Sequence, residues 1–351
     1  MISTRQDLFG FGHSRVSRPG SPSAPTITPE ERDTVTLGER QASWITDALA
    51  VTQFTGSGYL YNEAAKAALV EQQQNPPFAD APLVKLEDPF LIAPGWTTRP
   101  EKFDALVAHL LKEPANGSRA VYLKEGVAFE DKECTLATNL SPQDKVFVAV
   151  YDSVLSPPDK TAPQLDSAVE RIKSVHGEKV DVLGYSLGGL AVRKMLDDKL
   201  ETVDQVAFLG TAHQGTRFAA LASYVVKRDI KFAMNLAGVD AGHLEALEWM
   251  LPLNPEKPES NSKLADLNAN LHRQLAQTTE MLSIGSDGFS TITRPWGGTE
   301  GGDGLVQVSS TKLEGVPQAV LSGRGNKQHG QLPNDTEAFL QLADYYNWRL
   351  S

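Results

Sequence analysis

Ser186 lies in a segment whose residue types and spacing fit a catalytic serine, Gly184-Tyr185-Ser186-Leu187-Gly188-Gly189. This is the Gly-x-Ser-x-Gly pattern of a nucleophile elbow, where a strand turns sharply into a helix. The turn brings the flanking positions close to neighbouring chain, so they require glycine. The first amides of the helix then point towards the hydroxyl and favour an anion there. Ser186 is the predicted nucleophile; the alternative is a glycine-rich helix start without catalytic function.

A base must remove the proton of the serine, and after such an elbow the chain order is serine, acid, histidine. Of the seven histidines, His329 follows the predicted last strand and precedes the predicted last helix. His213 is the other contender, since it follows the strand after the elbow. The remaining five lie before the elbow or on predicted helices. His329 is therefore the predicted base, and the alternative is a loop histidine without a partner.

The acid orients the imidazole and stabilises the imidazolium that forms in the transition state. Asp287 lies directly at the end of a predicted strand, and Asp303 lies further along, between two glycines and before the His329 loop. Position relative to the sheet alone favours Asp287. Either residue has the alternative of a turn aspartate beside glycine.

Apolar runs and amphipathic stretches alternate along most of the chain, and this alternation predicts the elements that position these residues. Strands are predicted at 90–93, 145–151, 179–184, 205–209, 280–285 and 319–322. Helices are predicted at 37–51, 62–74, 100–113, 162–176, 187–200, 263–275 and 335–350. The pattern is typical of an α/β fold with a mainly parallel sheet covered by helices on both faces.

Two segments interrupt the alternation. Residues 115–142 contain possible short strands at 120–123 and 127–129 and are predicted to leave the sheet. Residues 214–264 are predicted to form a helical lid or cap within a catalytic domain of residues 37–351. Its apolar side chains either line a wall for an acyl chain or are simply buried in the cap. These side chains are Phe218, Tyr224, Val225, Val226, Phe232, Met234, Leu244, Leu247, Trp249 and Met250.

The elbow resembles that of bacterial lipases and of related inositol-deacylase and lecithin-acyltransferase-like hydrolases, which have the α/β-hydrolase fold. Gly210-Thr211-Ala212-His213-Gln214-Gly215-Thr216 is similar to the family segment Thr-Pro-His-x-Gly-Ser/Thr, with alanine in place of the usual proline. Gly302-Asp303-Gly304-Leu305-Val306 resembles the segment Asp-Gly-Leu-Val, whose aspartate is the triad acid. The resemblance therefore implies Asp303 as acid in preference to Asp287, and a supporting role for His213. It extends in scattered motifs from about residue 88 to 335.

An ester carbonyl under attack becomes an oxyanion that needs two amide donors, one from the residue after the nucleophile and one from the loop after an earlier strand. Leu187 supplies the first. The resemblance implies that the second comes from Pro94-Gly95-Trp96, so the Trp96 amide is the candidate. Proline and glycine at a strand end are also ordinary turn residues.

These residues predict a serine hydrolase that cleaves carboxylic esters, either small acyl esters or lipids, through an acyl-enzyme and without metal or organic cofactor. An acyltransferase with the same triad and a catalytically inactive hydrolase-fold binding protein are the alternatives. The net charge of −11 disfavours nucleic acid as a partner, because the summed field repels phosphate backbones. No apolar run has the ~18 to 20 residues of a membrane span. The same negative charge disfavours an anionic membrane surface, so any contact with a lipid surface is expected to be transient and through the lid.

The first 36 residues are predicted to be a flexible leader, because residues 13–29 are rich in Ser, Pro, Gly and Arg. They lack the apolar core of a secretory signal, so the expected location is cytoplasmic. Recognition of the leader by a specialised secretion system is the alternative. The single cysteine, Cys134, excludes an intramolecular disulfide.

Overall fold

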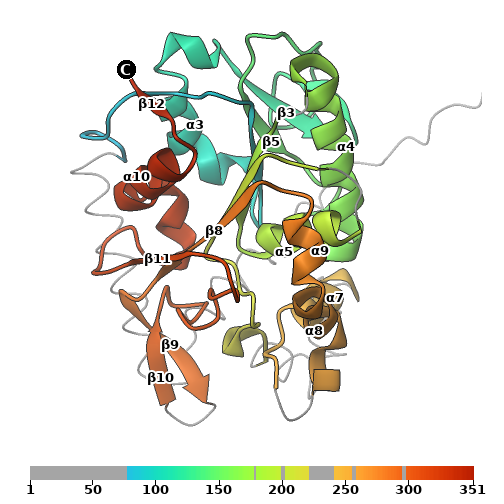
Figure 1. Ribbon diagram of the computed structural model, residues 1–351, viewed down its shortest axis with the longest axis vertical. Coiled ribbons are helices and arrows are strands. Elements are labelled where there is room, and N and C mark those ends of the chain that lie inside the picture. Colours follow the sequence, from blue (N-terminus) through green and yellow to red (C-terminus); the bar gives the residue numbers. More distant parts are fainter. Residues whose placement is uncertain (1–76, 178, 199–201, 221–240, 255–257, 295–297) are drawn as a thin grey trace, which may run out of the picture.

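A computed structural model describes residues 77–351 apart from 178, 199–201, 221–240, 255–257 and 295–297 (Figure 1). The predicted leader and the predicted helices at 37–51 and 62–74 lie outside the described residues. So does most of the predicted lid segment before residue 241.

The fold is built on an eight-stranded sheet with the order β11-β8-β7-β6-β2-β5-β3-β4. Its strands are β2 (Phe90–Ala93), β3 (Ala120–Lys124), β4 (Val127–Phe129), β5 (Val146–Ala149), β6 (Asp181–Tyr185), β7 (Gln205–Leu209), β8 (Glu280–Ser286) and β11 (Gln318–Leu321). Neighbouring strands are parallel except for the pair β3 and β4. Every residue of β2 and β5 is buried, which explains why these strands have continuous apolar sequences rather than alternating ones.

Helices cover both faces of this sheet (Figure 1). On one face α3 (Asp104–Leu110) and α10 (Thr336–Tyr345) pack on a core that includes Phe90, Phe103 and Phe339. On the other face α4 (Pro158–His176) and α5 (Leu187–Asp197) bury residues such as Ile172 and Met195. The mainly parallel sheet between two helical layers is the α/β-hydrolase arrangement, and the fold class predicted from the sequence is confirmed.

One prediction about the sheet is wrong: residues 120–129 do not leave it. Strand β3 pairs in parallel with β5, and β4 closes that edge as its antiparallel neighbour. The physical reason is burial. Residues 120–123 are all buried, so their backbone amides and carbonyls must find partners inside the protein, and the sheet supplies them.

The C-terminal part also differs from the prediction. The predicted helix 335–350 ends at Tyr345, and the chain turns at Asn347, whose φ is 53°. Strand β12 (Arg349–Leu350) then pairs with β1 (Val84–Lys85) in a small sheet. The predicted helix 263–275 is two helices, α8 (Ser262–Ala269) and α9 (Leu271–Leu275).

The predicted helix 100–113 also differs in detail, because it begins as the 3₁₀ turn η1 (Pro100–Phe103) and its α-helical part ends at Leu110. The remaining short turns are η2 (Pro114–Asn116) and η3 (Pro258–Asn261). The glycine-rich segment after β8 contains an antiparallel hairpin of β9 (Phe289–Arg294) and β10 (Gly298–Gly302), which the sequence analysis did not predict.

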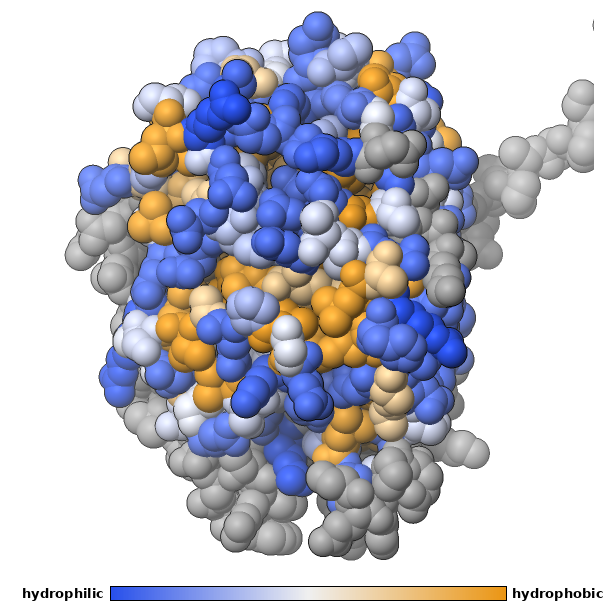
Figure 2. All heavy atoms as spheres, in the orientation of Figure 1, coloured by the Kyte–Doolittle hydropathy of each residue, from blue (hydrophilic) through white to orange (hydrophobic). Residues whose placement is uncertain are grey.

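Apolar residues are not confined to the core. The face shown in Figure 2 carries hydrophobic residues across its middle, with hydrophilic residues above and below. Exposed large apolar side chains include Val320 on the edge strand β11 and Leu275 on α9. Within the described ranges, no helix combines the length and hydropathy needed to cross a bilayer.

Candidate active site

Ser186 forms the turn between β6 and α5. Its backbone has φ 54° and ψ −127°, a region that non-glycine residues seldom adopt. The turn is held in place because the Ser186 amide donates to the carbonyl of Leu209 at the end of β7, at 2.9 Å. The serine hydroxyl thus stands at the carboxyl edge of the sheet and at the amino end of α5.

The glycines around Ser186 are required by close approach of neighbouring chain. A Cβ at Gly188 would lie 2.3 Å from the carbonyl oxygen of Ala93, and one at Gly189 would lie 2.1 Å from Oγ1 of Thr211. Neither position has room for a side chain without movement of its neighbour. The elbow therefore packs directly against the end of β2 and the loop after β7.

His329, the first residue of the 3₁₀ turn η4 (His329–Asn334), lies between Ser186 and Asp303. Its Nε2 is 2.9 Å from Ser186 Oγ, and its Nδ1 is 2.7 Å from Asp303 Oδ2. With the proton on Nδ1, the ring donates to the carboxylate, and its Nε2 accepts from the serine hydroxyl. His329 is 7% exposed and Asp303 is 1% exposed, so the hydrogen bond between these two residues is buried, whereas the one to Ser186 is partly buried.

Further contacts fix the orientation of the carboxylate and the imidazole. Asp303 Oδ1 accepts from the amides of Leu305 and Val306, at 3.0 and 2.7 Å. The Tyr185 hydroxyl donates to the His329 carbonyl at 2.6 Å, and the Tyr185 ring stacks on the imidazole. These contacts leave Asp303 Oδ2 directed at the imidazole.

The two rival residues lie elsewhere. Asp287 is exposed, and its carboxylate accepts from the Ser322 hydroxyl at 3.1 Å. His213 is fully buried against the Phe208 ring, with its Nδ1 3.3 Å from a guanidinium nitrogen of Arg193. Burial, and then the charge of Arg193, hold the pKa of His213 well below its usual value. It is Asp303 that contacts His329.

The sequence analysis missed the role of Arg193 in this region. Its guanidinium is fully buried and donates to Gln274, Asn268 and the carbonyl of Leu267, which ties α5 to α8 and α9. Burial lowers its pKa to about 9. An arginine on the predicted nucleophile helix gives no sequence signal for burial, because most arginines are exposed.

The loop at residues 94–96 passes next to the serine. A Cβ at Gly95 would lie 2.7 Å from Ser186 Cβ and 2.7 Å from the Tyr185 carbonyl oxygen. Leu187 is the first residue of α5, so its amide has no partner within the helix. The side chain of Trp96 packs with that of Leu187 in a third apolar cluster. Both predicted oxyanion-hole residues are thus neighbours of Ser186.

The curated relatives of this chain are bacterial triacylglycerol lipases. One from Pseudarthrobacter phenanthrenivorans is 28% identical over 200 residues, which cover 52% of this chain and 60% of that protein. One from Burkholderia plantarii is also 28% identical over 200 residues, covering 52% and 53%. Over about half of its length the chain is therefore similar to bacterial triacylglycerol lipases, in agreement with the α/β-hydrolase resemblance of its motifs. The matched region spans little more than half the length of either relative.

Among solved structures, the mature lipase of Bacillus licheniformis aligns with a TM-score of 0.47 at 14% identity, covering 78% of this chain and 94% of that one. No family model matches the sequence.

A small cavity of about 10 Å³ adjoins the loop at residues 94–96. It is lined by Pro94, Gly95, Trp96, Tyr151, Val154, Ser156, Thr161, Leu187 and Gly188. Tyr151 was not singled out from the sequence. The available signal was its position as the last residue of the strand predicted at 145–151, since in open α/β sheets ligands bind at the carboxyl ends of the strands.

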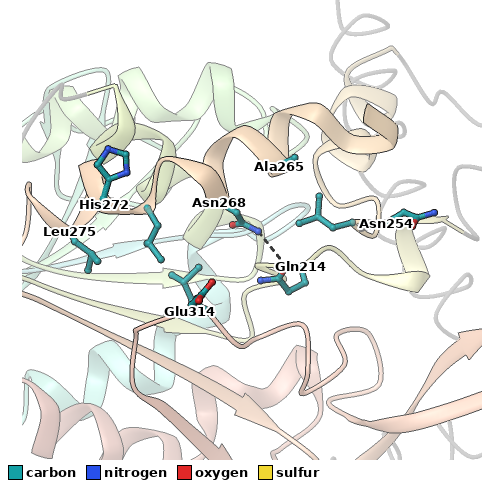
Figure 3. Close-up of a pocket in the computed structure, with 10 residues that line it drawn as sticks. Gln214, Asn254, Ala265, Asn268, His272, Leu275 and Glu314 are labelled. Atoms are coloured by element: carbon teal, nitrogen blue, oxygen red, sulfur yellow. Dashed lines mark hydrogen bonds between the residues drawn. The ribbon is translucent and has the colours of Figure 1, made fainter. Parts of the chain in front are cut away.

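A second cavity, of about 490 Å³, lies between α8, α9 and the loop around Leu313 (Figure 3). Asn268 and Gln214 face each other across it and form a hydrogen bond of 3.4 Å. None of the five predicted site residues lines this cavity. It is separate from the candidate active site.

Helix α7 (Ala241–Trp249) belongs to the predicted lid segment and shares an apolar cluster with the nucleophile helix. Leu247, Trp249 and Met250 are buried in the same apolar cluster as Leu187 and Leu190. The Trp249 indole donates to Asp159 at the start of α4, at 3.1 Å. These three side chains are therefore buried, and both interpretations of the segment stay predictions. Five of the remaining seven, Tyr224, Val225, Val226, Phe232 and Met234, lie outside the described residues.

One acidic group, Asp88, Asp181 and Asp204, brings its carboxylates within 4.8 Å of one another. It lies at the amino ends of β2, β6 and β7, the edge of the sheet opposite to Ser186. Burial, and then the charges of the two neighbours, raise the pKa of Asp181 to about 8. These carboxylates are therefore outside the candidate active site.

Proposed function

We propose that this chain is a serine hydrolase that cleaves carboxylic esters, with Ser186 as nucleophile, His329 as base and Asp303 as acid. The observation that carries the proposal is the continuous chain of hydrogen bonds from Ser186 Oγ through the imidazole to the Asp303 carboxylate, at 2.9 and 2.7 Å. The similarity to triacylglycerol lipases supports the same chemistry.

In the proposed reaction, Ser186 Oγ attacks the ester carbonyl while His329 Nε2 takes the hydroxyl proton. The amides of Trp96 and Leu187 stabilise the oxyanion of the tetrahedral intermediate. The imidazolium, stabilised by Asp303, then gives its proton to the departing alcohol, which leaves an acyl-enzyme. His329 next removes a proton from water, and the resulting attack releases the carboxylic acid and restores the serine.

The surroundings of Ser186 support an apolar acyl group in the substrate. Trp96 and Leu187 belong to an apolar cluster that continues into α7 of the cap. An acyl chain of an ester held by the oxyanion hole would contact this cluster and gain from removal of apolar surface from water. We propose accordingly that residues 214–264 act as a lid that touches lipid surfaces transiently.

The decisive experiment is labelling with a fluorophosphonate probe, combined with hydrolysis of p-nitrophenyl esters of increasing acyl length. We expect the probe on Ser186 and a fall of ~10⁴ to 10⁶ in kcat for Ser186→Ala, without a change in Tm. Ser174→Ala is the matched control, because Ser174 is exposed on α4 and bonds only to its own helix. Near wild-type turnover by purified Ser186→Ala would refute the proposal.

A further inference from the structure

Tyr151 lies at the same edge of the sheet as Ser186. It follows β5 by two residues, and β5 pairs in parallel with β2, with Val148 opposite Ile92. The loop after β2 contains Gly95 and Trp96, so the two chain segments leave the sheet side by side. This arrangement explains why Tyr151 lines the same cavity as the predicted oxyanion-hole residues.

The hydroxyl of Tyr151 has no hydrogen-bond partner among the described residues, although it is buried. The residue is 9% exposed, and its ring packs in the core beneath α4. A buried hydroxyl without a partner destabilises a fold, and phenylalanine would fill the same space without that cost. An unpaired hydroxyl at this place therefore points to a partner that arrives with a ligand. Burial raises the pKa of Tyr151, so the phenol remains a neutral donor.

The cavity indicates what that ligand offers. Its volume of about 10 Å³ is close to the smallest that holds one water molecule, so it has room for a single oxygen atom and no larger group. Trp96 and Leu187, whose amides would bind a carbonyl oxygen in the proposed reaction, line the same space. A carbonyl oxygen from the substrate matches both the size of the cavity and the donor character of the phenol.

We propose that the Tyr151 hydroxyl is a third donor to the ester carbonyl oxygen as that oxygen becomes an oxyanion. The inference rests on the proposed acyl transfer at Ser186. The phenol donates a hydrogen bond and keeps its proton throughout, so the proton balance of the reaction is unchanged. Because the negative charge is greatest in the tetrahedral state, the bond strengthens there and acts on kcat more than on KM.

The test is Tyr151→Phe, which keeps the ring and removes only the hydroxyl. Loss of one oxyanion donor typically costs ~10² to 10³ in kcat, and we expect a fall of about this size with KM nearly unchanged. The rate of fluorophosphonate labelling should fall as well, because the phosphoryl oxygen would occupy the same donors. The Tm should stay the same or rise, since the hydroxyl has no hydrogen-bond partner among the residues that the structure describes.

Tyr346→Phe is the matched control with the opposite expectation. The Tyr346 hydroxyl donates to the carbonyl of Val182 and accepts from the amide of Ala207, at 2.7 and 2.9 Å. Both partners lie in the strands β6 and β7, before the loops that form the candidate active site. Its removal should lower Tm and leave kcat unchanged. The pair separates a hydroxyl that serves the reaction from one that serves the fold.

The possible outcomes distinguish the role of Tyr151 from the proposed hydrolase activity. Full kcat in Tyr151→Phe, or a fall in Tm like that of Tyr346→Phe, overturns the role of Tyr151 while leaving the proposed hydrolase in place. A raised KM with unchanged kcat overturns it too, because the hydroxyl would then bind the ground state. Wild-type turnover by Ser186→Ala overturns the proposed function and the role of Tyr151 together.

Discussion

Replacement of Asp303 by asparagine tests the proposed triad most sharply, because the structure predicts how the amide would be oriented. Asp303 Oδ1 accepts from two backbone amides, whereas Oδ2 faces His329 Nδ1. An asparagine oxygen can replace only one of these two acceptors. It will take the place of Oδ1, because there it satisfies two buried donors, and its NH₂ group will face the imidazole.

That orientation selects the wrong tautomer of His329. The NH₂ group is a donor, so Nδ1 must accept, and the ring proton moves to Nε2. Nε2 lies 2.9 Å from Ser186 Oγ and can then no longer take the proton of the serine. In other serine enzymes this change lowers kcat by ~10⁴, which corresponds to ~5 kcal/mol of transition-state stabilisation.

The assay is kcat for a p-nitrophenyl ester, measured for Asp303→Asn and for Asp287→Asn as the matched control. Asp287 is exposed and bonds to Ser322, so its variant should stay within a few-fold of wild type. Full activity in Asp303→Asn with an inactive Asp287→Asn would refute the assignment. Partial activity in both single variants with loss in the double variant would point to a shared role.

Two further predictions concern stability. Burial and the neighbouring carboxylates raise the pKa of Asp181 to about 8, so between about pH 4 and pH 8 the folded state keeps a proton that the unfolded state has lost. The free energy of unfolding should therefore fall as pH rises through this window, by at most ~1.4 kcal/mol per pH unit, and urea denaturation of Asp181→Asn should lack this decline. An equal decline of the free energy of unfolding with pH in Asp181→Asn and in the wild type would contradict the raised pKa of Asp181. Gly189→Ala should destabilise the fold by ~1 to 3 kcal/mol because its Cβ would overlap Thr211 Oγ1, and adding Thr211→Ala should restore part of the Tm; no loss in the single variant would contradict the steric argument.

The elbow could be predicted from the sequence because its cause is local. Gly188 and Gly189 are needed wherever a strand turns into a helix so tightly, and their spacing from Ser186 follows from the turn itself. His329 is 143 residues from Ser186, yet its position could be predicted. The reason is that a parallel sheet brings the loops after its strands to one edge, and only chain order is needed to choose the loop.

Other features depend on contacts between distant residues, and the sequence carries little signal for them. Residues 115–142 were predicted to leave the sheet because the alternation of strands and helices breaks there, and the partner of β3, strand β5, lies more than 20 residues further along the chain. The missing partner of the Tyr151 hydroxyl is visible only once the surrounding atoms are placed. Which strands pair, and which buried polar groups find a hydrogen-bond partner, depends on the packing of the whole chain. The periodicity of apolar residues in the sequence does not predict either.

The choice between Asp287 and Asp303 shows how one unpredicted element can change an assignment based on sheet position. The sequence places Asp287 at the end of β8, which is where an acid is expected. The hairpin of β9 and β10 follows at once, and its register pairs Phe289 with Gly302. The hairpin therefore brings the chain back to the end of β8, and a Cβ at Gly301 would lie 3.3 Å from the Asp287 carbonyl oxygen. Asp303 is the next residue after β10, so it lies near the end of β8 as well, where it contacts His329. Asp287 is exposed to solvent.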